Sequence, residues 1–363
     1  MKKTITILAT LFVATVFAQE GAPASPYYDG FNFTQNGSDL KNALATIVTT
    51  THTTILTYSQ ARDGIKITDL DPADATNTNV LLLYGFTETI CPASPSDDND
   101  HRRRDKNSFG GGNSCEWNRE HTYARSLGTP NLEPTDANSD IHHLRACDVQ
   151  RNSNRGNLKF GQGTGNSGVV ASFWYPGDEW KGDVARMMMY MYLRYGNQCL
   201  PSNVAVGTSN TLDSSMIDLL LQWNAEDPVS PYEDLRNIYL NNASNTYGQG
   251  NRNPFIDNPY LATMIWGGPA AQNRWPALAT AQFDLLASVS VYPNPSYDHN
   301  INITTESPLE TIELISINGQ LMQKISKPSA VNNTYTIQDL PSGFYFLKLT
   351  SDNKTVTKKV LIN

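Results

Sequence analysis

Two different hydrophobic patterns divide the chain near residue 285, and this change most strongly limits what it can fold into. From Val289 to the C-terminus, apolar and polar residues alternate with period two in runs such as INIT, TIELISI and FYFLKLT. Such alternation is typical of strands that bury one face. Asn318-Gly319, between two of these runs, predicts a tight hairpin turn. We therefore expect a small all-β sandwich over residues 286–363.

The longer part of the chain, residues 19–285, mixes helical and strand patterns. Apolar residues recur at roughly helical spacing between Leu40 and Ile55, whereas residues 79–86 (NVLLLYGF) form a short apolar run typical of a buried strand. Residues 182–196 and 212–224 are apolar segments that we predict to be helices. With 363 residues in all, the chain is long enough for one large domain and one small domain.

The N-terminus has the features of a secretory signal peptide over residues 1–18. Two lysines precede an apolar run from Ile5 to Phe17, and residues 16–18 (VFA) form a small-x-small cleavage pattern. The run is too short to span a bilayer comfortably, which disfavours the alternative of a membrane anchor. No other segment is long and apolar enough for a transmembrane segment. We expect an exported chain that begins at Gln19 after cleavage.

The cysteines indicate how the exported chain is stabilised. There are four, Cys91, Cys115, Cys147 and Cys199, and their spacing lacks the CxxC pair typical of zinc sites. In an exported protein, an even number of cysteines predicts disulfides, so we expect two. Three pairings are open, and Cys91–Cys115 with Cys147–Cys199 is the one that we expect.

Charge is unevenly distributed along the chain. The formal net charge is −8, whereas nucleic-acid-binding proteins usually carry a basic face. Between His101 and Phe160, however, ten Lys or Arg residues and seven Asp or Glu residues give a local excess of +3. The basic residues therefore gather around residues 115–128, where three titratable groups stand side by side.

Residues 115–128 (CEWNREHTYARSLG) contain Arg119, Glu120 and His121 in succession. Histidine is the side chain best suited to remove a proton near neutral pH, and a carboxylate suits a hard cation such as Mg²⁺. Together they indicate metal-assisted hydrolysis, although a lone Glu-His pair is more often a surface salt bridge. Adjacent residues on a flat strand point to opposite faces. Glu120 and His121 can therefore share one phosphate only if the strand twists, bulges or ends there.

A second polar segment, residues 140–161 (DIHHLRACDVQRNSNRGNLKFG), follows about twenty residues later. If residues 146–155 form a helix, Asp148, Asn152 and Arg155 share one face by the i, i+3, i+4 rule. An asparagine carbonyl is a hard oxygen ligand for a cation, and an arginine can grip a phosphate. This segment therefore supplies a second oxygen ligand for a cation and a phosphate-binding arginine, which a hydrolytic site needs in addition to the Glu-His pair.

Four blocks together resemble the bacterial endonuclease I family over roughly residues 27–275. They are WNREH (117–121), DIHHLRACDVQRNSNRGN (140–157), GDVAR (182–186) and QGNRNPFID (249–257). The resemblance implies an α+β nuclease domain with a ββα-metal active-site motif. It also implies cleavage of DNA, and often of RNA, with little sequence preference and to 5′-phosphate products. Mg²⁺ is the usual metal of the family, with Ca²⁺ or Mn²⁺ as the alternatives.

The resemblance also suggests a role for individual residues. By motif position, His121 is expected to be the general base, Glu120 a metal ligand and Asn152 the second metal ligand. Three arginines are candidates for contact with substrate phosphate: Arg155, which we choose from helical spacing, Arg119 and Arg186.

The chain departs from the family pattern in two places. The family commonly has Val-Trp-Pro after the histidine, where this chain has residues 122–124 (TYA). It commonly has His-Asn-Leu-x-Pro, where this chain has residues 142–146 (HHLRA). The second departure places His143 where an asparagine usually lies, and the role of His143 is left open.

The C-terminal part resembles the sorting domain of the type IX secretion system, which is found in Bacteroidetes. The matching segments are VYPNPSYDHNINI (291–303) and LPSGFYFLKLTSDNKTVTKKVLIN (340–363). The resemblance implies that the type IX secretion machinery is a partner. The protein would pass through the periplasm and then be secreted or attached to the cell surface.

The sequence thus predicts a secreted, divalent-metal-dependent endonuclease that hydrolyses DNA without base preference, with RNA as a further candidate substrate. One alternative is an extracellular nucleic-acid-binding surface protein without catalysis. Another is a zinc-dependent hydrolase of a different ester, with His121, His142 and His143 as ligands. The preference between DNA and RNA, the metal and the oligomeric state are left open by the sequence.

Overall fold

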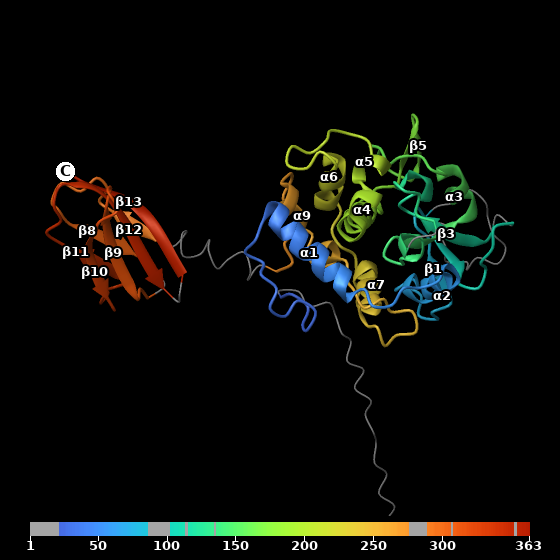
Figure 1. The fold of residues 1–363 in the computed structure, drawn as a ribbon, viewed down its shortest axis with the longest axis horizontal. Helices are drawn as coiled ribbons and strands as arrows, with labels where there is room; N and C mark the ends of the chain where they lie inside the picture. The colour runs from blue at the N-terminus through green and yellow to red at the C-terminus, as the bar shows by residue number, and fades with distance from the viewer. Residues whose placement is uncertain are drawn as a thin grey trace, which may run out of the picture. The chain divides into compact units, whose positions relative to one another are not determined.

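The computed structural model divides the chain into two compact units, residues 1–274 and 275–363 (Figure 1). The residues that it describes are 22–85, 102–112, 115–133, 136–275, 289–305, 308–351 and 354–363. The predicted signal peptide and the predicted domain boundary at residue 285 lie outside these ranges, so both stay predictions. No helix among the described residues is long and apolar enough to cross a bilayer.

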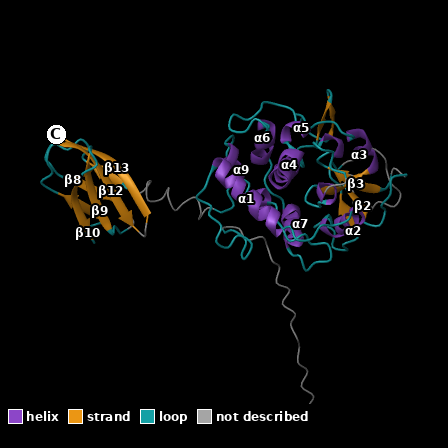
Figure 2. Cartoon of the chain, in the orientation of Figure 1, coloured by secondary structure: helices purple, strands orange, loops and turns teal. Residues whose placement is uncertain are grey.

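Most helices of the first unit lie on one side, and its short strands lie on the other together with α2 and α3 (Figure 2). The long helices are α1 (Gly37–Thr51), α2 (Tyr58–Thr68), α4 (Lys181–Tyr195), α6 (Asp218–Glu226) and α7 (Pro231–Asn241). The shorter ones are α3 (Val149–Arg155), α5 (Pro201–Val204), α8 (Pro254–Asp257) and α9 (Tyr260–Trp266), with 3₁₀ turns η1 (Arg125–Leu127), η2 (Asp136–Ser139) and η3 (Gly196–Cys199).

Helix α4 is the core helix of this unit. It is buried from Gly182 to Leu193 on every face, and the two charged side chains in that stretch, Asp183 and Arg186, form buried ion pairs. It packs against α1 and α6 (Figure 1). The predicted helix at residues 182–196 is therefore confirmed, and Gly196, with φ of +55°, ends it.

A strand–strand–helix unit lies on the opposite side. Strand β3 (Trp117–His121) pairs antiparallel with β4 (Leu144–Asp148), and α3 follows at once. The sequence predicted helix from residue 146, but β4 continues to Asp148. Asp148 instead caps the N-terminus of α3, because its side chain accepts hydrogen bonds from the backbone N–H groups of Gln150 and Arg151. The other strands are β1 (Asn79–Leu81) with β2 (Arg103–Asp105), and β5 (Gly168–Val170) with β6 (Phe173–Tyr175).

The described residues of the second unit form two antiparallel sheets around one apolar core. Strands β7 (Ser290–Tyr292), β8 (Ile301–Thr304) and β11 (Thr334–Ile337) form one sheet. The other contains β9 (Thr311–Ser316), β10 (Leu321–Ser326), β12 (Gly343–Ser351) and β13 (Lys354–Ile362). The inward residues of both sheets form one buried cluster, and Gly319, with φ of +80°, turns the β9–β10 hairpin. The all-β prediction is confirmed.

The cysteines correct the prediction of two disulfides. Cys147, on β4, and Cys199, in η3, are fully buried free thiols. Cys115 is disulfide-bonded, and Cys91 lies outside the described residues. The predicted Cys147–Cys199 bridge is therefore wrong. Both thiols are held as small apolar side chains in the core.

Candidate active site

The end of β3, helix α3 and turn η1 line a cavity of about 410 Å³. Glu120, His121 and Asn152, which the sequence proposed as one site, all reach it. The β3–β4 register runs without a shift as far as His121, so β3 contains no bulge. Instead β3 ends at His121, which is one of the three ways in which the two adjacent side chains could share one site.

Glu120 is a buried carboxylate with one oxygen engaged. Its Oε1 accepts a hydrogen bond from the Tyr84 hydroxyl at 2.9 Å and lies 3.3 Å from Nη1 of Arg155. Its Oε2 has no hydrogen-bond partner among the described residues. Burial raises the pKa of Glu120 to about 7, against the opposing effects of Arg155 and Tyr84. A cation next to Oε2 would favour the ionised form.

His121 is held as a neutral imidazole. Its Nε2 lies 3.0 Å from the backbone carbonyl oxygen of Asn138 and 3.1 Å from the Asn138 side-chain oxygen. Because these oxygens only accept, Nε2 carries the proton and Nδ1 keeps the lone pair. Burial lowers the pKa of His121 well below its ordinary value, and the neighbouring His143 and Arg125 lower it further. The Nδ1 atom of this ring can therefore take a proton from water.

Asn152 is oriented by its amide nitrogen. Nδ2 donates to the Asn118 side-chain oxygen at 2.7 Å and to the Arg119 carbonyl at 3.2 Å. Its Oδ1 is left without a hydrogen-bond partner in the part of the chain that is described. Asn154 is exposed and does not line the cavity, whereas Asn157 lines it from beyond the end of α3.

The donors present fit a hard cation better than zinc. Glu120 Oε2 and Asn152 Oδ1 are oxygen ligands, and Mg²⁺ is commonly held by one or two carboxylates while it keeps several waters. Within the described ranges, no three His, Cys, Asp or Glu side chains are grouped to hold a metal. The zinc alternative is also disfavoured by the histidines, because Nε2 of His142 and of His143 contact backbone carbonyls at 3.3 and 2.7 Å.

Comparison with known proteins identifies this fold. The endonuclease I family pattern matches residues 36–260. The chain belongs to the endonuclease I family. It is thus a nuclease, a phosphodiester hydrolase, and its C-terminal unit matches the secretion system C-terminal sorting domain over residues 290–363. The sorting domain marks it as a secreted or surface-attached protein of the type IX system.

Two relatives carry the name extracellular ribonuclease. The protein from Bacillus subtilis (strain 168) is 37% identical over 260 residues, which are 68% of this chain and 82% of that protein. The protein from Bacillus amyloliquefaciens is 39% identical over 242 residues, 64% of this chain and 75% of that protein. A solved structure of a type IX secretion surface component of Porphyromonas gingivalis matches with 15% identity and a TM-score of 0.19. It covers 23% of this chain and 12% of that one, and carries no argument.

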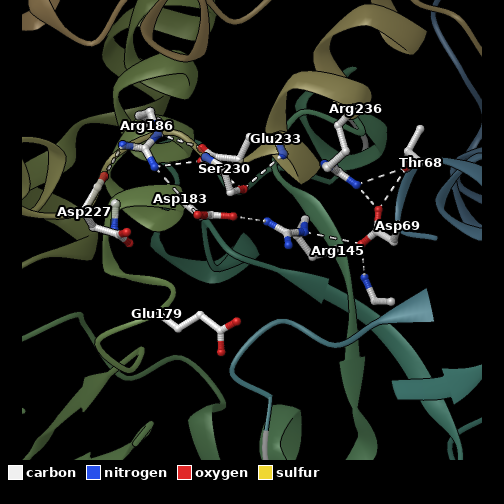
Figure 3. Close-up of polar contacts among 12 residues, drawn as sticks. Thr68, Asp69, Arg145, Glu179, Asp183, Arg186, Asp227, Ser230, Glu233 and Arg236 are labelled. Carbon is white, nitrogen blue, oxygen red and sulfur yellow. Dashed lines mark hydrogen bonds and ion pairs between the residues drawn. The ribbon is translucent and has the colours of Figure 1, made fainter. Parts of the chain in front are cut away.

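Two arginines of this endonuclease I domain do not act as the sequence predicted. Arg186 is fully buried away from the cavity, where its guanidinium binds the Glu233 carboxylate at 2.6 and 2.8 Å (Figure 3). The prediction that it contacts phosphate is therefore wrong. Arg155 is 1% exposed and donates to the carbonyls of His121 at 3.0 Å and Thr122 at 2.8 Å. It fixes the end of β3 beside Glu120 and has no exposed Nη group to offer a phosphate.

Arg119 remains a candidate for substrate contact. It lines the cavity, stacks 3.5 Å above the Tyr58 ring and donates to the Tyr58 carbonyl. The sequence missed Tyr84 and Asn138, which orient Glu120 and His121. Tyr84 lies inside a run that indicates only a buried strand, and Asn138 acts partly through its backbone, which no side-chain motif reveals. Arg125 was also missed, although it lies in the same quoted motif.

Proposed function

We propose that this nuclease is a secreted endonuclease that hydrolyses RNA and DNA without base preference, using Mg²⁺. The observation that carries the proposal is that Glu120, His121 and Asn152 line one cavity, while Glu120 Oε2, His121 Nδ1 and Asn152 Oδ1 have no protein partner among the described residues. A base with a free lone pair and two hard oxygen ligands is the set that metal-assisted hydrolysis needs.

Each residue of the site has a separate role in the proposed reaction. His121 Nδ1 removes a proton from the attacking water, while its Nε2–H, held by Asn138, keeps the ring in position. Glu120 and Asn152 would hold Mg²⁺, which would supply positive charge next to the reacting phosphate. Arg155 and Tyr84 keep the Glu120 carboxylate in place. Water forms the new P–O bond, the P–O3′ bond breaks, and O3′ takes up a proton from solvent water, so the products carry a 5′-phosphate and a 3′-hydroxyl.

Both nucleic acids are proposed as substrates for a chemical reason. The two relatives are named ribonucleases, which supports RNA. Because the nucleophile is water and not the ribose 2′-hydroxyl, the same residues can cleave DNA. The local excess of basic residues around the motif supports binding to the backbone, which is common to both polymers.

The biological route is proposed from the two ends of the chain. The signal peptide over residues 1–18 would direct export to the periplasm, and the sorting domain would then engage the type IX machinery. The sorting domain would then be removed, or would attach the nuclease to the cell surface.

Product analysis tests the proposed chemistry. Purified protein is incubated with supercoiled plasmid and with single-stranded RNA, with Mg²⁺ and with excess chelator. We expect cleavage of both with Mg²⁺ only, and 5′-phosphate ends. RNA products with 2′,3′-cyclic phosphate, together with intact DNA, would refute a water nucleophile. Retarded but uncleaved nucleic acid would favour the alternative of a binding protein without catalysis. Activity that survives dialysis without added metal would favour zinc.

A further inference from the structure

Among the described residues, three arginines line the cavity, and of these only Arg125 is paired with an exposed carboxylate. Arg155 and Arg119 are engaged by backbone carbonyls. Arg125 lies in turn η1, four residues after His121, and its Nη1 pairs with Oε1 of Glu133. Both members of this pair line the cavity, and their side chains are 42% and 50% exposed.

The backbone fixes both members of the pair while their side chains stay accessible. The Arg125 carbonyl accepts hydrogen bonds from Gly128 N and Leu132 N at 3.3 and 3.2 Å, which draws residues 125 and 133 together. The Asn131 side-chain oxygen accepts a hydrogen bond from the backbone N–H of Glu133 at 3.1 Å, which holds the backbone of Glu133 in place. The loop is therefore built to present an arginine and a carboxylate at the edge of the cavity.

The chemistry of this pair matches that of a phosphate contact. A guanidinium binds carboxylate and phosphate oxygens with the same fork of N–H donors. An exposed ion pair is only weakly stabilising, so an incoming phosphodiester can displace the carboxylate at little cost. Arg125 is also close enough to His121 for its charge to affect that ring.

We propose that Arg125 binds the substrate phosphate next to His121, and that Glu133 holds Arg125 until the substrate displaces it. This inference rests on the proposed function, since it assigns the phosphate contact of that same cavity. Glu133 is then a competing carboxylate in the free protein. Arg125 takes the role that the sequence gave to Arg155 and Arg186.

Binding measurements in a non-cleaving background test the assignment. Anisotropy of a labelled single-stranded oligonucleotide is followed in His121→Ala, alone and combined with Glu133→Gln, Arg125→Ala or both. Removal of the competing carboxylate should tighten binding about fivefold, the equivalent of one exposed ion pair. Loss of Arg125 should weaken binding about tenfold or more and reduce the salt dependence by about one phosphate contact.

The double variant distinguishes displacement from general charge repulsion. If Glu133 acts by holding Arg125, Glu133→Gln should have no effect once Arg125 is alanine. An equal gain of affinity with and without Arg125 would overturn the inference, as would unchanged binding in Arg125→Ala. Glu179→Gln is the matched control, because Glu179 forms a similarly exposed pair with Arg102 outside this cavity and should leave affinity unchanged.

The same protein preparation separates this inference from the proposed function. Mg²⁺-dependent cleavage by the wild type is measured beside the variants. Cleavage by the wild type with no effect of the Arg125 and Glu133 changes would overturn only the inference. Absence of cleavage by the folded wild type would refute the proposed function itself. Arg125→Lys should recover part of the affinity, because a lysine keeps the charge but not the fork.

Discussion

Replacing Arg186 with methionine should unfold the nuclease domain more readily without changing how the folded protein handles substrate. Nε and Nη2 of Arg186 bind Glu233 at 2.6 and 2.8 Å, and Nη1 donates to the Asp227 carbonyl at 2.8 Å. The network continues through Asp183 to Arg145, and then to Asp69 and Arg236 (Figure 3). Every charged member of this network is buried.

The loss of stability in Arg186→Met depends on the partners that Glu233 and Asp183 keep. Without Arg186, Glu233 keeps only its capping contacts with Ser230, and Asp183 keeps only Arg145 as a cationic partner. Removing one partner of a buried ion pair costs about 3–5 kcal/mol, a large part of the stability of an ordinary domain. With an m-value of about 2–3 kcal/mol/M, the urea midpoint should fall by roughly 1–2.5 M.

Tryptophan fluorescence during urea unfolding is the assay. Five of the six tryptophans lie in residues 1–274 and none lies in residues 290–363, so the signal reports on the nuclease domain and not on the sorting domain. Lys181→Ala is the control on the same helix, because the Lys181–Glu226 pair is partly exposed and should contribute at most about 1 kcal/mol. An unchanged midpoint in Arg186→Met, combined with loss of nucleic-acid binding, would refute the structural role.

Three further predictions concern metal binding, pH and the thiols. Asn152→Ala should raise the Mg²⁺ concentration for half-maximal cleavage about tenfold, whereas the exposed Asn154→Ala should not; equal effects would remove Asn152 as a ligand. His143 is buried, and burial lowers its pKa to about 4. Above pH 6.5 this side chain is neutral in both the folded and the unfolded state, so the stability that it contributes to the folded state is fully present there. As pH falls from about 6.5 to 4, only the unfolded state gains this proton, so the free energy of unfolding should fall by on the order of 3 kcal/mol. The fall should be smaller in His143→Gln. Urea midpoints at pH 7 and pH 4.5, measured for both proteins, test this prediction. Cys147 and Cys199 should resist alkylation in the native protein and react after denaturation, and mass spectrometry that found them bridged would contradict the structure.

The sequence predicted those parts of the molecule that depend on patterns among residues close together in the chain. Period-two alternation identified the strands of the sorting domain, because each strand buries one face. Motif spacing brought Glu120, His121 and Asn152 together correctly, because β3, β4 and α3 are close neighbours along the chain. Strand β4 was mistaken for the start of the helix since it is buried on both faces and shows no alternation.

The errors concern contacts between distant segments. Arg186 lies in a family motif, but its partner Glu233 is 47 residues away, so no local pattern shows that its charge is neutralised in the core. Arg155 shares a helical face with Asn152 as predicted, yet its guanidinium turns to carbonyls at the end of β3. Cysteine count cannot distinguish thiols in the core from those in bridges. Pairing depends on which elements pack together.

His121 provides the most direct test of the central claim, that this cavity carries out base-assisted phosphodiester hydrolysis. Single-turnover cleavage of a labelled oligonucleotide is measured with saturating Mg²⁺ for the wild type and for His121→Ala, with oligonucleotide affinity measured in parallel. The account predicts a rate loss of about 10²–10⁴-fold, the usual contribution of a general base, with affinity unchanged and partial recovery when imidazole is added. Cleavage by His121→Ala at a rate near that of the wild type would contradict it.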